Sequence, residues 1–416
     1  MRHGRGRTGE RTMTRINRYL ANASPVSSKS IAQAARDDPA ILNLSIGEPE
    51  FGPPEYALAG IGTIDLQPET YLPALKRYEH SRGSLVLRRA ISNWYMRRYG
   101  LAADPESEIL ITHGGIEALN VALLSLTDPA DRIALSDPGY ALYARAIEVV
   151  GRQPVPIRRA AHGPCSADYA GCQVILVNSP ENPTGHVLGN SDWDALASVA
   201  EANDAWVVHD EVYDTLCYAR DHRPAKSLAA LSERSVLVNS FSKKFGVPGL
   251  RVGWLVAPAR VIDVAIRVHE ALCLGVSELA ESVALRLIEH PDADAWCDRQ
   301  KVPLAAHNEA ALHALGSSAG FRWPIVPMGG LFLFPDVTGI RRRLSARDDT
   351  PGGDDGSVVA RYLLRNAKVA VVPGGVYGAA GRNHIRISTG GNRVLFLDAL
   401  DRIAAACRAL PACDTH

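Results

Sequence analysis

Short apolar runs rich in β-branched residues alternate with helical patterns from about residue 84 onward, and this alternation restricts the fold more than any other feature. The runs lack strict polar–apolar alternation, which indicates strands buried on both faces of a parallel sheet. Helices are expected at Ser84–Tyr99 and Gly115–Leu126. The expected strands are Glu108–Thr112, Arg132–Leu135, Gln173–Val177, Ala205–His209, Val236–Asn239 and Val252–Val256. The pattern predicts an α/β domain with a large, doubly wound, mainly parallel sheet.

The C-terminal part changes character, because its expected strands lie among helices without regular alternation. These strands are Leu331–Phe334, Val369–Val372 and His384–Ser388. A chain of 416 residues exceeds one typical core. We therefore expect an arm at residues 1–39, a large domain at residues 40–280 and a smaller α+β domain at residues 281–416. The Asp- and Gly-rich residues 347–356 are expected to form a surface loop.

Composition argues against several classes of protein. Lys+Arg 45 and Asp+Glu 45 cancel, so we expect no nucleic-acid partner. No apolar run has the length of a membrane span, so no membrane partner is expected either. The seven cysteines are scattered without a CxxC pair, which predicts neither a disulfide framework nor a metal site. Residues 1–15 are basic and polar with no apolar stretch behind them, so we expect no signal peptide and a soluble, cytoplasmic protein.

The run Ser240–Gly253 carries the clearest chemistry. It places two serine hydroxyls beside Lys243, and Arg251 follows that lysine eight residues later. Such a set suits a phosphate-bearing aldehyde, because a lysine amine can be pushed toward neutrality and can then bond to the aldehyde carbon. Ser240 and Arg251 would hold the phosphate, and the intervening glycines permit close backbone approach. The run resembles the cofactor-lysine segment of fold-type I pyridoxal phosphate enzymes, specifically the class I/II aminotransferases.

A second segment resembles the family's phosphate-binding turn. Thr112–Leu119 places a hydroxyl and two glycines between an expected strand and an expected helix. Backbone N–H groups and the helix dipole bind anions at such a turn. The resemblance implies that Gly114, Gly115 and Ile116 contact the phosphate.

Three further segments follow expected strand ends, where doubly wound sheets bind ligands. In the resemblance, Tyr140 stacks on the pyridine ring, for which an aromatic face is apt. Asn182, in a turn similar to the family's Asn-Pro-x-Asn-Pro-Thr-Gly, donates to the phenolic oxygen of the cofactor. Asp210 faces the pyridine nitrogen and keeps it protonated, while Tyr213 contacts the phenolic oxygen. Glu211 is expected to be structural.

The resemblance also implies a substrate site. Arg386 matches the arginine that binds the substrate α-carboxylate, for which its planar fork is suited. Asn182 and Gly47 are expected beside the substrate, with the segment 40–54 associated with the small domain. Tyr78 matches a tyrosine that reaches the cofactor phosphate of the neighbouring subunit, which implies a homodimer with shared active sites. The chain departs from the family after Tyr78 and around Cys273, so substrate choice and cross-subunit contacts stay open there.

The resemblance covers roughly residues 40–405. It implies a pyridoxal phosphate-dependent aminotransferase that moves an amino group between an L-amino acid and a 2-oxo acid. A role in secondary, peptide-antibiotic amino-acid biosynthesis is the more specific expectation. The alternative is another pyridoxal phosphate enzyme on the same scaffold, such as a lyase, decarboxylase, cyclase or oxygen-using oxidase or hydroxylase. A regulator built from such a domain is disfavoured, because the residues before about 40 are too few for a DNA-binding module. The identity of the amino donor and acceptor stays open.

Overall fold

The computed structural model describes residue 16 and residues 38–57, 78–159, 165–345 and 353–411. Most of the arm expected at residues 1–39 and most of the loop expected at 347–356 lie outside these ranges. The loop prediction is wrong at its C-terminal end, where α14 (Asp355–Asn366) begins behind Asp354, whose side chain caps the helix. None of the described helices is long and apolar enough to cross a lipid bilayer.

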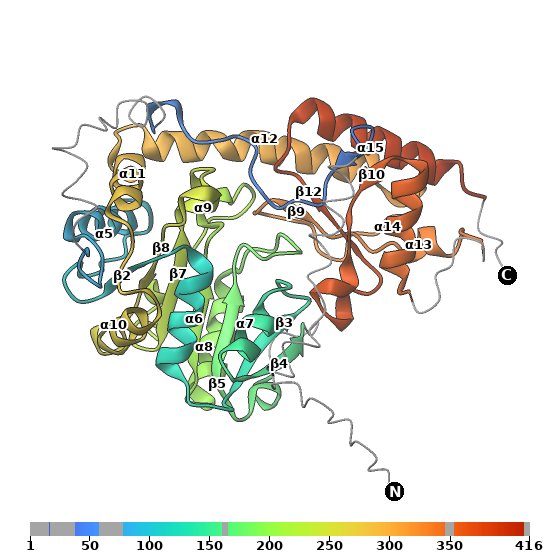
Figure 1. The fold of residues 1–416 in the computed structure, drawn as a ribbon. Coiled ribbons are helices and arrows are strands. Elements are labelled where there is room, and N and C mark those ends of the chain that lie inside the picture. The colour runs from blue at the N-terminus through green and yellow to red at the C-terminus, as the bar shows by residue number, and fades with distance from the viewer. Residues whose placement is uncertain (1–15, 17–37, 58–77, 160–164, 346–352, 412–416) are drawn as a thin grey trace, which may run out of the picture.

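A seven-stranded sheet forms the centre of the molecule (Figure 1). Its strand order is β2-β8-β7-β6-β5-β3-β4, and β8 alone runs antiparallel to its neighbours. The strands are β2 (Ile109–Thr112), β3 (Arg132–Asp137), β4 (Gln153–Arg158), β5 (Cys172–Asn178), β6 (Trp206–Asp210), β7 (Ser235–Ser240) and β8 (Gly253–Val256). The predicted α/β architecture with a mainly parallel sheet is confirmed.

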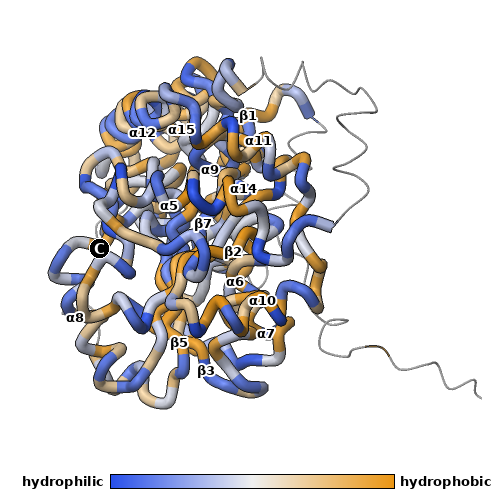
Figure 2. The backbone as a smooth tube through the Cα atoms, turned by 90° about the vertical axis from the view of Figure 1, so that its left-hand side faces the viewer, coloured by the Kyte–Doolittle hydropathy of each residue, from blue (hydrophilic) through white to orange (hydrophobic). Residues whose placement is uncertain are grey.

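Helices cover both faces of this sheet, so side chains pointing either way are buried. Along β6, Val207 belongs to the core on one face and Val208 to the core on the other. This explains why the strand sequences are continuously apolar, as Figure 2 shows along β5. One face packs against α6 (Gly115–Leu126), α7 (Tyr143–Val149) and α10 (Ala259–Cys273). The other packs against α5 (Leu85–Tyr99), α8 (Asn190–Ala202), α9 (Phe241–Lys244) and α11 (Glu278–Glu289).

Two strands of the structure are missing from the sequence predictions. β4 contains Pro154 and Pro156, which argue against a central strand, and it lies at the sheet edge where proline is tolerated. β1 (Leu42–Asn43) has two residues and pairs in parallel with β10 (Val369–Ala370). The single strand expected at Val369–Val372 is two strands, since β11 (Val372–Pro373) joins a different sheet.

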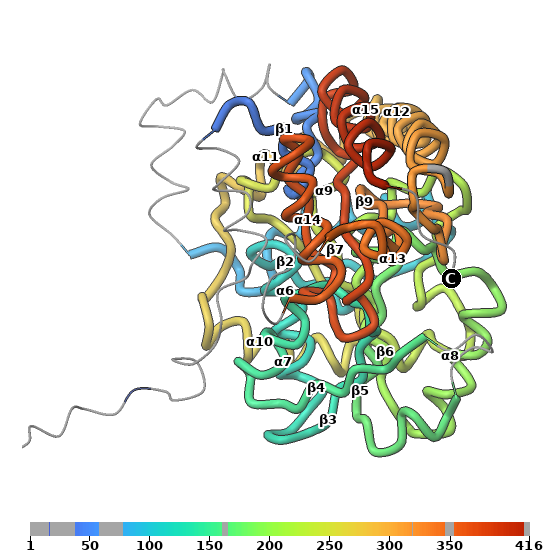
Figure 3. Tube along the Cα trace, turned by 90° about the vertical axis from the view of Figure 1, so that its right-hand side faces the viewer, coloured from blue at the N-terminus to red at the C-terminus, as the bar shows by residue number. Residues whose placement is uncertain are grey.

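The C-terminal part surrounds a second hydrophobic core. Its antiparallel sheet has the order β11-β12-β9, with β12 at Ile385–Ser388 and β9 at Phe332–Leu333. The helices α13 (Thr338–Arg341), α14 and α15 (Arg393–Arg408) belong to this part. The chain near β1 lies beside these C-terminal elements (Figure 3), and Leu44 joins their core.

The helix α12 (Ala293–Ala314) contributes side chains to both hydrophobic cores, and this packing locates the boundary between the two parts of the chain. α11 and the start of α12 contribute Leu287, Trp296 and Cys297 to the core of the large sheet. Ala311, near the end of α12, belongs to the second core instead. We therefore propose that the boundary lies inside α12 rather than at residue 280.

Candidate active site

The carboxyl edge of the large sheet gathers the residues singled out by sequence. β5, β6 and β7 run parallel, so Asn178, Asp210 and Ser240 end neighbouring strands at one edge. β8 runs the other way, so the residues before its first residue, Gly253, enter the sheet at this same edge. Arg251 is thereby brought near the strand ends, where sheets of this type bind ligands.

A cavity of about 250 Å³ opens at this edge. Nine of the residues expected around the cofactor line it, namely Gly115, Ile116, Tyr140, Asn182, Asp210, Tyr213, Ser240, Lys243 and Arg251. The predicted set is therefore brought together by the fold. Its assignment to a cofactor stays a proposal.

A larger cavity of about 730 Å³ lies on the other side of Asn178. Its charged groups include Arg159 and Glu181, and these already pair with each other at 2.9 Å. Among the residues that the structure describes, neither a lysine nor Asp210 lines this larger cavity. We therefore assign the chemistry to the smaller one.

The two adjacent lysines of α9 have opposite surroundings. Lys244 is fully buried, and its Nζ lies 2.7 Å from both Asp214 Oδ1 and Asn239 Oδ1. Lys243 lines the cavity, and its Nζ donates to Gly47 O at 2.7 Å. Burial lowers the pKa of Lys243 to about 8, and the nearby arginines of the site act in the same direction. Lys243 is therefore the lysine with an amine available for covalent chemistry.

Asp210 ends β6 with its carboxylate beside the cavity. Tyr143 donates to Asp210 Oδ2 at 2.6 Å, and the Val212 N–H donates to Oδ1 at 3.2 Å. Burial raises the pKa of Asp210 to about 6, while these hydrogen bonds oppose the shift. A cationic partner in the cavity would stabilise its ionised form.

Close backbone packing forms the phosphate end of the expected site. Gly114 has φ 82° and precedes α6, and a Cβ there would lie 2.7 Å from the guanidinium of Arg251. Arg251 itself donates to Pro248 O at 3.0 Å and to His113 O at 3.2 Å. Ser240 Oγ accepts from Ser242 N at 3.0 Å. N–H groups, hydroxyls and a guanidinium therefore lie around one end of the cavity.

The substrate end is built around Arg386. Arg386 is buried, donates to Ser45 O at 2.7 Å and to Asn182 Oδ1 at 3.3 Å, and lies over the Phe332 ring at 4.3 Å. Its Nε has no hydrogen-bond partner among the described residues. Gly47 lies close by, since a Cβ there would meet the Phe332 ring at 2.6 Å. A buried guanidinium with an unpaired donor suits a small anionic ligand.

Gly114, Gly47 and Arg386 do not line the cavity but lie against Arg251, Lys243 and Asn182, which do. Tyr78 is the predicted site residue that lies apart. Its side chain is 84% exposed, and it does not line the cavity. Conversely, Tyr143 and Asn178 line the cavity without having been singled out individually. Tyr143 lies three residues after Tyr140 at the start of α7, and Asn178 begins the turn that contains Asn182. A strand-end position is the signal that could have identified Asn178.

These residues fit pyridoxal phosphate by the chemistry of their donors. The cavity brings together a half-buried lysine, a buried carboxylate and an aromatic side chain, namely Lys243, Asp210 and Tyr140. The glycine-lined turn beside Arg251 supplies donors for a phosphate. The orphaned Nε of Arg386 leaves one donor for the carboxylate of a substrate.

Comparisons with known proteins identify the family of this chain. The profile of the family described as aminotransferase class I and II matches residues 39–403. An arginine–pyruvate transaminase of Pseudomonas aeruginosa is 29% identical over 383 residues, which cover 90% of each chain. An aspartate aminotransferase of Musicola paradisiaca is 27% identical, covering 88% of this chain and 89% of that protein. The structure of an aspartate aminotransferase from Thermus thermophilus with maleate superimposes with a TM-score of 0.81 at 25% identity, covering 95% of this chain and 100% of the other. Because the family match extends over most of the chain, the protein belongs to the class I and II aminotransferases, which depend on pyridoxal phosphate.

Proposed function

We propose that this enzyme exchanges an amino group between an L-amino acid and a 2-oxo acid in the cavity lined by Lys243 and Asp210. The observation that carries the proposal is the placement of the two groups. One cavity holds an amine with a pKa of about 8 and a buried carboxylate with a pKa of about 6. An amine whose pKa lies near neutral pH suits proton transfer, and a buried carboxylate suits a cationic ring nitrogen beside it.

Lys243 is proposed to bind the cofactor and to move the substrate proton. Pyridoxal phosphate, when bound, supplies an electron-withdrawing ring that stabilises negative charge at the carbon bearing the amino group. The substrate amine would displace Lys243 from the aldehyde carbon of the cofactor. The free Lys243 amine would then remove the proton from the substrate carbon that bears the amino group and donate a proton to that former aldehyde carbon. Its lowered pKa leaves a useful neutral fraction near pH 8.

Asp210 is proposed to hold the proton on the ring nitrogen. Tyr143 and the Val212 N–H fix both carboxylate oxygens, so the carboxylate keeps one orientation. Burial makes an unpaired carboxylate costly at this position. A protonated ring nitrogen would offset that cost, and the ring would in turn keep its proton.

Arg386 is proposed to bind the α-carboxylate that every amino acid and 2-oxo acid substrate carries. Its Nη atoms are oriented by Ser45 O and Asn182 Oδ1, and its Nε is free of protein partners among the described residues. Arg386 adjoins the cavity through Asn182, while the cationic side chains that line the cavity itself, among the described residues, are Lys243 and Arg251. We propose that donors with neutral or basic side chains are preferred. L-arginine is one, since a relative is named an arginine–pyruvate transaminase.

A panel of L-amino acids with pyruvate or 2-oxoglutarate tests the proposal. We expect the donor to yield its 2-oxo acid while the acceptor yields its amino acid in equal amount, without ammonia. Ammonia or peroxide in place of the second amino acid would favour a lyase or an oxygen-using oxidase and would overturn transamination. A role in peptide-antibiotic biosynthesis stays a prediction, tested by whether non-proteinogenic donors outperform common ones.

We further propose a homodimer whose partner supplies Tyr78. The exposed Tyr78 side chain is available to another chain, and the cofactor phosphate would gain a donor beyond Ser240 and Arg251. Light scattering at micromolar protein should report a dimer. Mixing inactive Tyr78→Ala and Lys243→Ala proteins should restore part of the activity, because hybrid dimers contain one intact site. A fully active monomer would contradict this, as would failure of the mixture after proven subunit exchange.

A further inference from the structure

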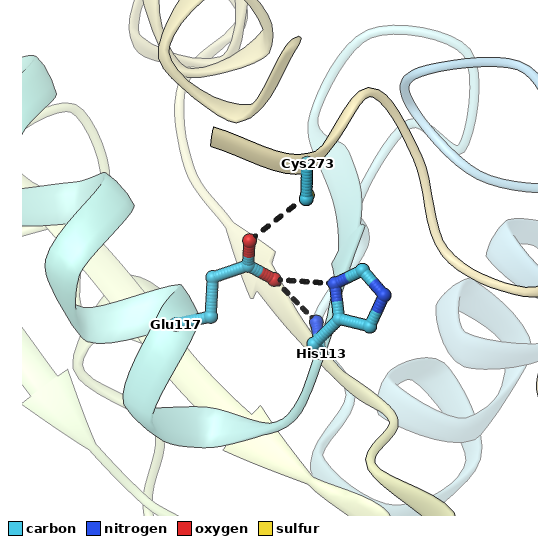
Figure 4. A group of neighbouring side chains, drawn as sticks. All are labelled: His113, Glu117 and Cys273. Atoms are coloured by element: carbon cyan, nitrogen blue, oxygen red, sulfur yellow. Dashed lines mark hydrogen bonds and ion pairs between the residues drawn. The ribbon is translucent and has the colours of Figure 1, made fainter. Parts of the chain in front are cut away.

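Three side chains with metal-ligating atoms meet beside the phosphate end of the cavity (Figure 4). They are His113, in the turn before α6, Glu117, in the first turn of α6, and Cys273, the last residue of α10. Glu117 Oε1 lies 3.0 Å from Cys273 Sγ, and Glu117 Oε2 lies 3.1 Å from His113 Nδ1. One potential ligand atom of each residue lies within 4.8 Å of the others.

We propose that His113, Glu117 and Cys273 bind one Zn²⁺ ion. Zinc bonds of about 2.0–2.3 Å in a tetrahedral arrangement separate neighbouring ligand atoms by about 3.3–3.8 Å. Cys273 Sγ and His113 Nδ1 approach different oxygens of Glu117, at 3.0 and 3.1 Å, and the ligand atoms of the three residues all lie within 4.8 Å of one another. Coordination of one ion therefore needs a modest rearrangement of the side chains and none of the backbone. Sequence inspection missed the site because Cys273 is far along the chain from the other two ligands.

The ligand chemistry selects the metal. A thiolate, an imidazole and a carboxylate suit zinc, whereas Mg²⁺ and Ca²⁺ prefer oxygen ligands. The surroundings are positive, because Arg251 donates to His113 O at 3.2 Å and α6 begins here. Two anionic ligands, the Glu117 carboxylate and the Cys273 thiolate, are therefore needed to balance the positive charge of the ion and of these neighbours. The thiol of Cys273 would release its proton to solvent as the Zn–S bond forms.

His269 provides the support that metal ligands usually have. It is fully buried, and its Nδ1 lies 3.5 Å from Glu117 Oε1 and 3.4 Å from Cys273 Sγ. Outer partners of this kind orient the ligands and raise metal affinity. We assign His269 as a positioning residue, with water completing the coordination on the partly exposed side of His113.

A zinc ion bound here would link two segments that lie at the phosphate end of the cavity. It would tie the end of α10 to the turn that holds Gly114. The chain after Cys273 also touches the segment that follows Tyr78, since a Cβ at Gly275 would lie 3.3 Å from Glu79 O. The ion would therefore act as a structural link at the phosphate end of the cavity, whatever reaction the cavity performs.

Zinc titration of the cofactor-loaded protein, after chelation and dialysis, tests the proposal. Calorimetry and metal analysis should report one tightly bound Zn²⁺ per chain, and X-ray absorption should show one sulfur ligand at about 2.3 Å. His269→Asn should weaken binding by about 10–100-fold, and Cys273→Ser by more than that with loss of the sulfur signal. The exposed Cys165 and His313 provide matched controls, and Cys165→Ser and His313→Gln should bind zinc as the unchanged protein does.

Circular dichroism verifies that each variant is folded, and Glu117→Gln replaces Cys273→Ser if the latter is not. If a folded variant of a ligand residue, Cys273→Ser or Glu117→Gln, binds zinc as tightly as the unchanged protein does, the proposal is overturned. A coordination shell of oxygen and nitrogen alone would also overturn it, because that shell indicates zinc on the cofactor phosphate. These readouts do not depend on transamination, so the site and the proposed function fail independently.

Discussion

Two groups of polar side chains lie side by side at the ends of β6 and β7, and they differ in where their partners are. The charged groups of the buried set pair within the chain: Lys244 contacts Asp214 at 2.7 Å, and His222 Nε2 lies 2.8 Å from Glu211 Oε2, although His222 Nδ1 has no partner among the described residues. The cavity group is incomplete. Lys243 contacts one backbone carbonyl through a hydrogen bond, and Arg386, which reaches the site from β12, has an unpaired Nε among the described residues.

Access to the cavity separates the two groups. Buried polar groups with partners offset the cost of leaving water, and a group that faces a cavity can gain a further partner from a ligand. Neighbours in sequence differ in this respect: Asp210 and Lys243 line the cavity, whereas Glu211 and Lys244 pair with His222 and Asp214. Residue type therefore does not identify the functional member of each pair, but its access to the cavity does.

The largest expected effect comes from Lys243→Ala. Removing the amine should abolish the absorption band of the covalently held cofactor and reduce turnover by about 10⁴-fold, at the upper end for a proton-transfer group. The melting temperature of the protein without cofactor should change little, because Lys243 is not part of the buried network. Absorption spectra and steady-state kinetics measure the result. A normal absorption band in this variant would show that another lysine holds the cofactor.

Lys244→Met should have the opposite profile. It removes one partner of the buried pair with Asp214, and such a loss costs about 3–5 kcal/mol of the free energy of unfolding. The absorption band of the bound cofactor should persist below the melting transition. Urea unfolding compared with the unchanged protein measures the loss. Unchanged stability would mean that the two lysines do not differ as described.

Asp210→Asn should separate activity from stability. Turnover should fall by about 100-fold or more, because the ring nitrogen loses its anionic partner. The protein without cofactor should become more stable at pH 7 by up to about 3 kcal/mol, because burial raises the carboxyl pKa to about 6. The raised pKa means that ionisation costs stability as pH rises from the unfolded value through 6, and Asn removes this cost. Denaturant curves at pH 4 and pH 7 test the sign, and equal stability changes at both pH values would contradict it.

The pH dependence of cofactor capture gives the smallest effect. The neutral amine attacks the aldehyde, and burial lowers the pKa of Lys243 to about 8. The capture rate in cofactor-free protein should therefore rise about tenfold from pH 7 to pH 9 and then level off. Stopped-flow absorbance measures it. A rate still rising steeply above pH 10 would place the amine in an ordinary, exposed environment.

Much of the fold was predictable because it follows from burial on both faces of the sheet. The helix expected at Gly115–Leu126 has the same bounds in the structure, and the expected central strands differ by one or two residues at their ends. β4 could not be predicted in this way. Its prolines are acceptable only in an edge strand, and the order of the strands in the sheet cannot be read from the local sequence. The splitting of β10 from β11 likewise depends on tertiary pairing.

The candidate site was predictable where a short segment carries it. Asp210 ends β6, Lys243 and Asn182 follow β7 and β5 within a few residues, and the fold brings all three to one cavity. Contacts between distant segments were not predictable. Examples are the hydrogen bond from Tyr143 to Asp210 and the meeting of Cys273 with Glu117, since no local pattern encodes either distance.

The reversed direction of β8 governs how the site tolerates insertions and deletions. Arg251 arrives at the cavity through the loop that leads from α9 into β8, and it has a φ of 58° there. That loop is held at its middle, because a Cβ at Gly246 would lie 2.5 Å from Gly52 O. A residue added or removed between Gly246 and Arg251 would displace the guanidinium of Arg251 while leaving Lys243 in place. The number of residues between Lys243 and Arg251 is therefore a length that the chain must keep for both side chains to reach the cavity.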